Sequence, residues 1–134
     1  MTNKATGAFD VKVNPQPAYD TTPGSPLVRF SLDKTFSGDL TATSIGEMLA
    51  AGTAGNGSGV YVAVERVTGT LGGRSGSFVL HHTGIMNRGV PSLLVRVAPD
   101  SATDQLVGLT GTMDIIITDG KHSYEFSYML PDVE

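Results

Sequence analysis

Tyr61, Glu65 and His82 are the residues of this chain best suited to acid–base chemistry or to orienting a ligand. They flank a Gly72-Gly73 pair, which can adopt the positive φ angles of a two-residue hairpin turn. This turn sets a register in which six residue pairs share one face of a two-stranded ribbon: Leu71 with Arg74, Gly69 with Gly76, Val67 with Phe78, Glu65 with Leu80, Ala63 with His82 and Tyr61 with Gly84. A phenol, a carboxylate and an imidazole therefore share a single surface.

The face that carries these three groups is predicted to line the interior of the protein. It holds aromatic and large aliphatic side chains, including Phe78, together with glycines that relieve crowding inside a tight barrel. Glu65 and His82 then point inward and lie diagonally across two strands, where long side chains can contact each other. The opposite face, with Val62 and Val64, is expected on the outside.

The sequence leaves two interpretations of Glu65 and His82 open. In the first, they form an acid–base or ligand-orienting pair in a pocket, with Tyr61 as a hydrogen-bond donor and Phe78 in the wall. In the second, Glu65 ties internal backbone groups and His82 is a core histidine with satisfied polar atoms. Burial would raise the pKa of Glu65, and attraction to His82 would oppose that rise. No metal site is expected, because His81 and His82 point to opposite faces of a strand, and no cofactor is expected.

A second hairpin is predicted around Asp119-Gly120, a dipeptide typical of tight turns. Its register places four further pairs on one face: Ile117 with His122, Ile115 with Tyr124, Met113 with Phe126 and Gly111 with Tyr128. Tyr124 and Tyr128 are candidate ligand contacts on this aromatic face. The alternative is that both belong to the core, as buried aromatic residues usually do.

These hairpins belong to a chain in which alternating polar and apolar residues predict about eight strands and little helix. Besides the two strands around Gly72-Gly73, the expected ranges are 6–13, 28–36, 39–49, 90–97, 106–118 and 122–130; a short helical turn over 46–51 is an alternative. Short connections favour antiparallel neighbours, so we expect an all-β fold, a single antiparallel up-and-down β-barrel, with a sandwich as the alternative. The proline-rich segment 15–26 is expected to cover the barrel mouth or a neighbouring subunit.

Composition sets the broad class of the protein. The 134 residues suit one domain spanning 1–134, and 40% hydrophobic residues are typical of a globular chain. A net charge of −4 without a basic run argues against nucleic acid as a partner. No stretch is apolar enough for a membrane helix and the N-terminus has no apolar signal core, so we expect a cytoplasmic protein with no membrane partner.

The stripe of Val60, Val62 and Val64 on the outer face predicts a covered surface. We expect a homo-oligomer, with a dimer slightly favoured over a trimer. The alternative is that the proline-rich segment of the same chain covers these valines.

Longer stretches of the chain resemble a known family. The segments GVYVAVERVTGTLGGRSGSFVLHHTG, VAPDSATDQLVGLTGTM and HSYEFSYML resemble a family of small bacterial proteins of unknown function. The barrel of that family is similar to that of allene oxide cyclase and, more distantly, to dirigent proteins. The chain departs from the family in one loop, where Pro99-Asp-Ser-Ala-Thr-Asp-Gln-Leu106 replaces a glycine-rich segment. The resemblance implies the fold and says little about activity.

Three classes of function are compatible with these residues and with the expected barrel. The first is binding of a small, largely apolar molecule inside the barrel, because an eight-stranded barrel can hold one small ligand. The second, implied by the likeness to allene oxide cyclase, is an isomerase or cyclase that uses Glu65 in the cavity. The third is a structural or interaction protein with a filled barrel.

Overall fold

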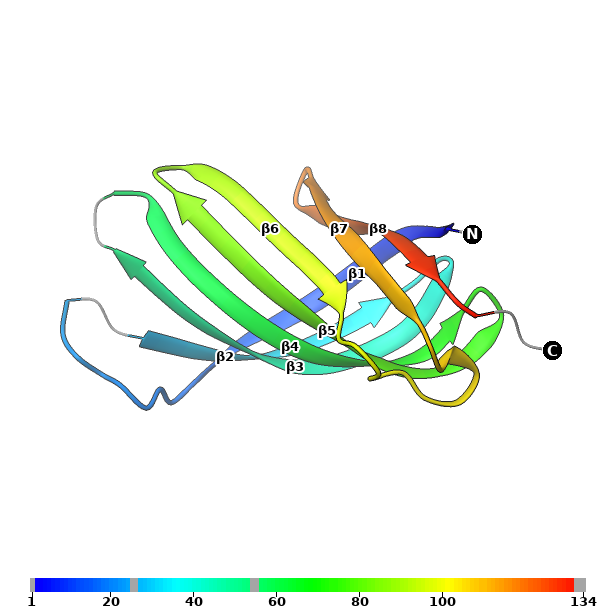
Figure 1. The fold of residues 1–134 in the computed structure, drawn as a ribbon. Helices are drawn as coiled ribbons and strands as arrows, with labels where there is room; N and C mark the ends of the chain where they lie inside the picture. Colours follow the sequence, from blue (N-terminus) through cyan, green and yellow to red (C-terminus); the bar gives the residue numbers. More distant parts are fainter. Residues whose placement is uncertain (1, 25–26, 54–55, 132–134) are drawn as a thin grey trace.

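The computed structural model describes residues 2–24, 27–53 and 56–131 and shows a closed barrel of eight antiparallel strands joined in sequence order (Figure 1). The strands are β1 (Asn3–Gln16), β2 (Leu27–Phe36), β3 (Leu40–Thr53), β4 (Ser58–Leu71), β5 (Arg74–Asn87), β6 (Val90–Val97), β7 (Thr110–Thr118) and β8 (Lys121–Met129). The predicted all-β up-and-down barrel is confirmed. A single short 3-10 helix, η1 (Asp104–Leu106), is found in the described residues.

Both predicted hairpins have the expected register. Gly72 and Gly73 have φ angles of 57° and 86°, and all six predicted pairs between β4 and β5 are present. The turn between β7 and β8 also has positive φ at both central residues, Asp119 and Gly120, and the four predicted pairs are present. Local turn chemistry thus determines which side chains face inward on half of the strands.

The barrel interior is tightly filled over roughly half of its length. Val67, Phe78, Leu80 and Phe126 are almost completely buried, as predicted, and Phe78 stacks on Phe126 with ring centroids 5.9 Å apart. This filled half lies toward the Gly72-Gly73 turn, which we call the closed end. The opposite end, where β2, β4 and β6 begin, is called the open end (Figure 1).

The structure differs from the sequence-based expectation in β3 and near the start of β7. Residues 46–51 continue β3 as a strand that pairs with both β2 and β4, so the alternative helical turn is absent. Leu106 lies in η1, where its side chain is buried, and β7 begins only at Thr110. The expected strand from 106 was too long, because residues 106–109 form a turn in which the Leu109 N–H donates to the Leu106 carbonyl at 3.0 Å.

The loop before η1 takes the place of a strand beside β5. The backbone N–H groups of Ser77 and Val79 donate to the hydroxyls of Thr103 and Ser101, at 3.0 Å in both cases. The Ser75 N–H donates to the side-chain oxygen of Gln105 at 2.8 Å. Hence residues 101–105 cover the edge of β5 at the closed end.

The seam between β6 and β7 is the least paired part of the barrel. Of the described residues, only Arg96 and Thr112 pair across it, whereas β5 and β6 pair along the whole of β6. Figure 1 shows the two strands diverging toward the open end. No helix in the described ranges is long and apolar enough to cross a membrane.

Candidate functional site

A cluster of polar side chains lies inside the barrel, contributed by four consecutive strands. The carboxylate of Glu65 on β4 accepts a hydrogen bond from Lys34 Nζ on β2 at 2.7 Å and from Ser44 Oγ on β3 at 2.8 Å. His82 Nε2 on β5 lies 2.6 Å from Glu65 Oε2. Glu65 is 1% exposed, and its three partners are also buried. We call these four residues the Glu65 cluster.

Glycine at position 46 allows Glu65 to occupy this place. Gly46 pairs with Glu65 across β3 and β4, and a Cβ at position 46 would lie 2.4 Å from the Val64 carbonyl oxygen and 2.7 Å from the Glu65 Cβ. Any larger residue would force the two strands apart. Lys34 is also held from a second side, with its Nζ 5.2 Å from the centre of the Phe9 ring.

The electrostatics of the cluster keep Glu65 ionised. Burial alone would raise its pKa, but the hydrogen bond with His82 and the charge of Lys34 outweigh that effect and lower the pKa to about 2. The predicted opposition between burial and His82 is therefore present, and Lys34 adds to the lowering. Because both carboxylate oxygens already accept hydrogen bonds, the negative charge of Glu65 is compensated within the core.

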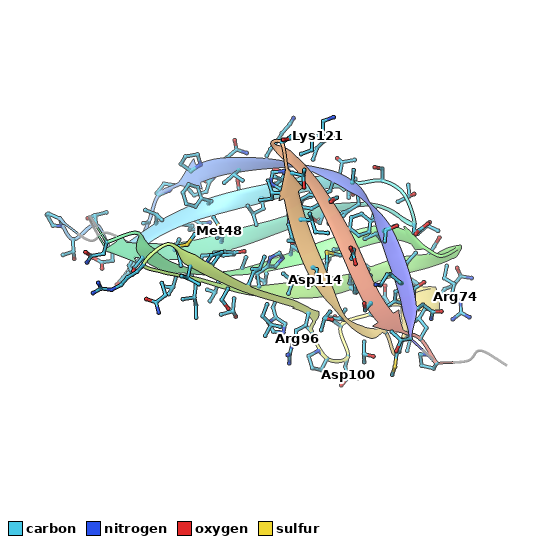
Figure 2. The ribbon with its side chains drawn as sticks, turned by 90° about the horizontal axis from the view of Figure 1, so that it is seen from above. Met48, Arg74, Arg96, Asp100, Asp114 and Lys121 are labelled. Carbon is cyan, nitrogen blue, oxygen red and sulfur yellow. The ribbon has the colours of Figure 1, made fainter. Side chains whose placement is uncertain are left out.

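A cavity of about 750 Å³ lies above this cluster, at the open end of the barrel. Its walls are almost wholly apolar and come from the ends of β2 to β6 and from Gly24 in the link between β1 and β2. The lining residues are Gly24, Val28, Met48, Ala50, Ala51, Gly52, Gly59, Val60, Tyr61, Gly84, Ile85, Met86, Pro91, Ser92 and Leu93. Figure 2 shows Met48, on the cavity wall, and Arg74, beside the closed-end turn, at opposite ends of the barrel.

Tyr61 connects the cavity with the Glu65 cluster. Its ring lies over Gly84, where a Cβ would come within 2.1 Å of Tyr61 Cε1. The ring centroid is 6.5 Å from that of His82. Burial, with a smaller contribution from the charge of Glu65, raises the pKa of Tyr61, so the phenol keeps its proton at neutral pH.

Glu65 and His82 themselves do not line this cavity. Each contributes to a smaller depression of about 330 or 460 Å³ formed mainly by outward-facing residues, while its own side chain stays buried. Thus the structure brings Glu65, His82 and Tyr61 together, but Tyr61 alone of the three reaches the large cavity.

The other sequence candidates lie in the filled half of the barrel. Phe78 is in the core, and Tyr128 stacks on Phe126 at 5.3 Å. The Tyr124 hydroxyl donates to the Ser37 carbonyl at 2.7 Å and accepts from the Leu40 N–H at 2.9 Å. It therefore ties β8 to the link between β2 and β3.

Sequence reasoning missed Lys34 and Ser44, although a signal for both was present. Lys34 lies two residues from Leu32 and from Phe36, so it shares their inward-facing parity on β2. Ser44 has the same relation to Ala42 and Gly46 on β3. Within the part of the chain that the structure describes, no three His, Cys, Asp or Glu residues lie together in a way that could hold a metal ion.

Comparison with known proteins gives a family and a close structural relative. A family described as "Protein of unknown function (DUF3224)" matches residues 5–128. A DUF3224 protein of unknown function from Shewanella oneidensis MR-1 has 51% sequence identity and a TM-score of 0.94, covering 99% of this chain and 100% of its own. No functionally curated protein matches. Because the match spans nearly the whole chain, this protein belongs to the DUF3224 family.

Proposed function

We propose that this protein binds a small, largely apolar molecule in the cavity at the open end of its barrel. The observation that carries this proposal is the contrast between the two halves of the interior. The closed half is filled by packed side chains, whereas the open half holds a cavity of about 750 Å³ with apolar walls. A concave apolar site of this size is typical of small-molecule binding sites.

The residues at the open end also show partial exposure of large apolar side chains. Met86 and Leu93 line the cavity and are both 42% exposed. When a ligand covers apolar surface that was in contact with water, the free energy of the system falls by about 25 cal/mol for each Å² of apolar surface buried. The cavity therefore offers a driving force for binding that the filled half cannot offer.

The two alternative functions have less support. An isomerase or cyclase that uses Glu65 would need this carboxylate near its substrate, but Glu65 does not line the cavity and both of its oxygens are engaged. A structural protein with a filled barrel would need a packed interior at both ends, but only the closed half is packed. The cytoplasmic location expected from the sequence stays a prediction, which fractionation of expressing cells would test.

The test uses an apolar fluorescent probe such as N-phenylnaphthylamine, together with native mass spectrometry of freshly purified protein. Ala50 lies half-buried on the cavity wall, so Ala50→Phe should fill part of the cavity and weaken probe binding about tenfold or more. Ala8→Phe is the matched control, because Ala8 on β1 does not line the cavity. Equal probe affinity in both variants, or no binding by the native protein, would refute the proposal.

A further inference from the structure

The chemistry of the cavity wall restricts the kind of molecule that it can take. We infer that the ligand is electrically neutral: a molecule with a long apolar body and a single uncharged polar group, such as a hydroxyl, an ester or a ketone. This inference rests on the proposed function and adds the class of ligand to it.

No charged residue lines the cavity among the residues that the structure describes. Of the described lining residues, Tyr61 and Ser92 alone have polar side chains. A carboxylate or an ammonium group that entered the cavity would find no ionic partner among these described lining residues.

An unpaired ion is expensive to bury. Transfer of a charged group from water into an apolar site costs far more than transfer of a hydroxyl or a carbonyl, which needs one hydrogen bond to be satisfied. A neutral ligand with the same apolar body thus gains the same hydrophobic contribution at a much lower desolvation cost. This difference selects against anions and cations alike.

The buried cation of the core does not remove this selection. Lys34 is 8% exposed, donates to Glu65 at 2.7 Å and packs against the Phe9 ring. Its charge is therefore compensated inside the core and is not among the groups that face the cavity. Recruiting Lys34 to a ligand carboxylate would leave the Glu65 carboxylate without its principal cation.

The surface cations at the open end are also unsuited to holding an anion in the cavity. Arg29 pairs with Glu47 on the outside of the barrel. Arg88, in the turn between β5 and β6, does not line the cavity. The chain as a whole carries a net charge of −4, which disfavours the approach of anions.

Tyr61 is suited to the one polar group of a neutral ligand. Its phenol is half-buried on the cavity wall, and its raised pKa keeps the hydroxyl protonated at neutral pH. A protonated phenol can donate a hydrogen bond to a hydroxyl or carbonyl oxygen and can also accept one. The ring is positioned over Gly84, so the hydroxyl is presented from a defined place on the wall.

The test compares ligands with one alkyl chain and different head groups. Dodecanol, methyl dodecanoate, dodecanoate and dodecylammonium are each used, below their micelle concentrations and at neutral pH, to displace N-phenylnaphthylamine from the native protein. The alcohol and the ester should compete about tenfold or more better than either ion. Tyr61→Phe should weaken the alcohol and the ester several-fold more than it weakens the probe, because it removes the hydroxyl that their polar group uses.

A matched pair of substitutions tests the same inference in the opposite direction. Leu93 and Leu94 are neighbours on β6 with similar exposure, but Leu93 lines the cavity and Leu94 does not. Leu93→Lys should improve dodecanoate binding about tenfold, because it adds a cation to the wall, whereas Leu94→Lys should leave it unchanged.

The outcomes separate this inference from the proposed function. If dodecanoate or dodecylammonium competes as well as dodecanol in the native protein, the ligand need not be neutral and the inference is wrong, although the cavity still binds apolar molecules. If neither the probe nor any member of the series binds, the proposed function fails and the inference fails with it.

Discussion

The carboxylate of Glu65 is one of the most constrained groups in the interior of this protein. A buried carboxylate is stable only when its charge is compensated, and here Lys34, His82 and Ser44 provide that compensation. Arrangements of this kind contribute to stability mainly through the cost of breaking them, because a lone charge left in the core has no partner. At the residue scale, the Glu65 cluster therefore acts as a tie between four strands beneath the cavity.

Removal of the Glu65 charge should destabilise the protein strongly. Glu65→Gln keeps the shape of the side chain but leaves the buried Lys34 ammonium uncompensated, so we expect the free energy of unfolding to fall by ~3 kcal/mol or more. Urea unfolding followed by far-UV circular dichroism measures this change. Glu125→Gln breaks the exposed pair with Lys4 and should cost less than ~1 kcal/mol. Equal losses in the two variants would show that the buried cluster is not a tie.

The pH dependence of stability should report the same group. The pKa of Glu65 is lowered from 4.5 to about 2 in the folded state, so its contribution is complete above about pH 4.5 and is lost as the pH falls toward 2. This difference corresponds to about 3 kcal/mol. Urea titrations between these pH values should show a shallower decline for Glu65→Gln than for the native protein. Parallel declines would contradict the assignment.

At the scale of elements, the strands differ in how firmly they are held. β4 pairs along its length with β3 and β5, whereas β6 is paired along its length on one side only and meets β7 at a single described position, Arg96 with Thr112. At the closed end, the side chains of Ser101, Thr103 and Gln105 take the place of β6 beside β5 and bond to the β5 backbone. Toward the open end, the described residues pair β6 with β5 but not with β7. The cavity is therefore bordered by the most weakly paired part of the sheet.

This asymmetry should be visible in amide hydrogen exchange. Backbone amides of residues 92–95 that are not bonded to β5 should exchange much faster than amides of residues 62–67 in β4, because they lack a ladder partner. Exchange followed by NMR resolves the individual amides. Uniformly slow exchange across β6 would indicate that the seam is closed in solution.

At the scale of the whole molecule, the outer surface of β3 to β5 carries many exposed apolar side chains. Val60, Val62 and Val64 are each about half exposed, so the described part of the proline-rich segment does not cover them. Ile45 on β3 and Ile85 on β5 are also exposed, which extends the valine stripe across three strands. Val60 and its pair partner Ile85 also border the cavity, so this surface reaches the open end of the barrel. Apolar surface of this kind is consistent with the homo-oligomer expected from the sequence.

The oligomeric state is a prediction that one substitution can test. We expect light scattering to give a dimer rather than a single 14.0 kDa species, with a trimer as the alternative. Val62→Lys should shift the assembly toward the monomer, because it places a charge in the centre of the covered surface. Thr35→Lys on the exposed side of β2 is the control and should leave the assembly unchanged. A monomer at high concentration would show that the valines are not an interface.

The sequence by itself determined the strand pairing and the faces of both long hairpins. Turn residues at Gly72-Gly73 and Asp119-Gly120 set the register locally, and the two-residue period of a strand then assigns every side chain to a face. The inward position of Glu65, His82 and Tyr61 followed from that register together with the aromatic, aliphatic and glycine residues that share their face. The parity of Lys34 with Leu32 would have placed this lysine inside as well.

Only the tertiary structure decided what Glu65 touches and where the interior is hollow. The contact with Lys34 depends on two registers, that of β2 with β3 and that of β3 with β4. It also depends on the close approach of β3 and β4 at Gly46. The cavity is the difference between the volume enclosed by a closed barrel and the summed volume of the inward-facing side chains. That difference depends on the curvature and closure of all eight strands, which no local pattern of residues encodes.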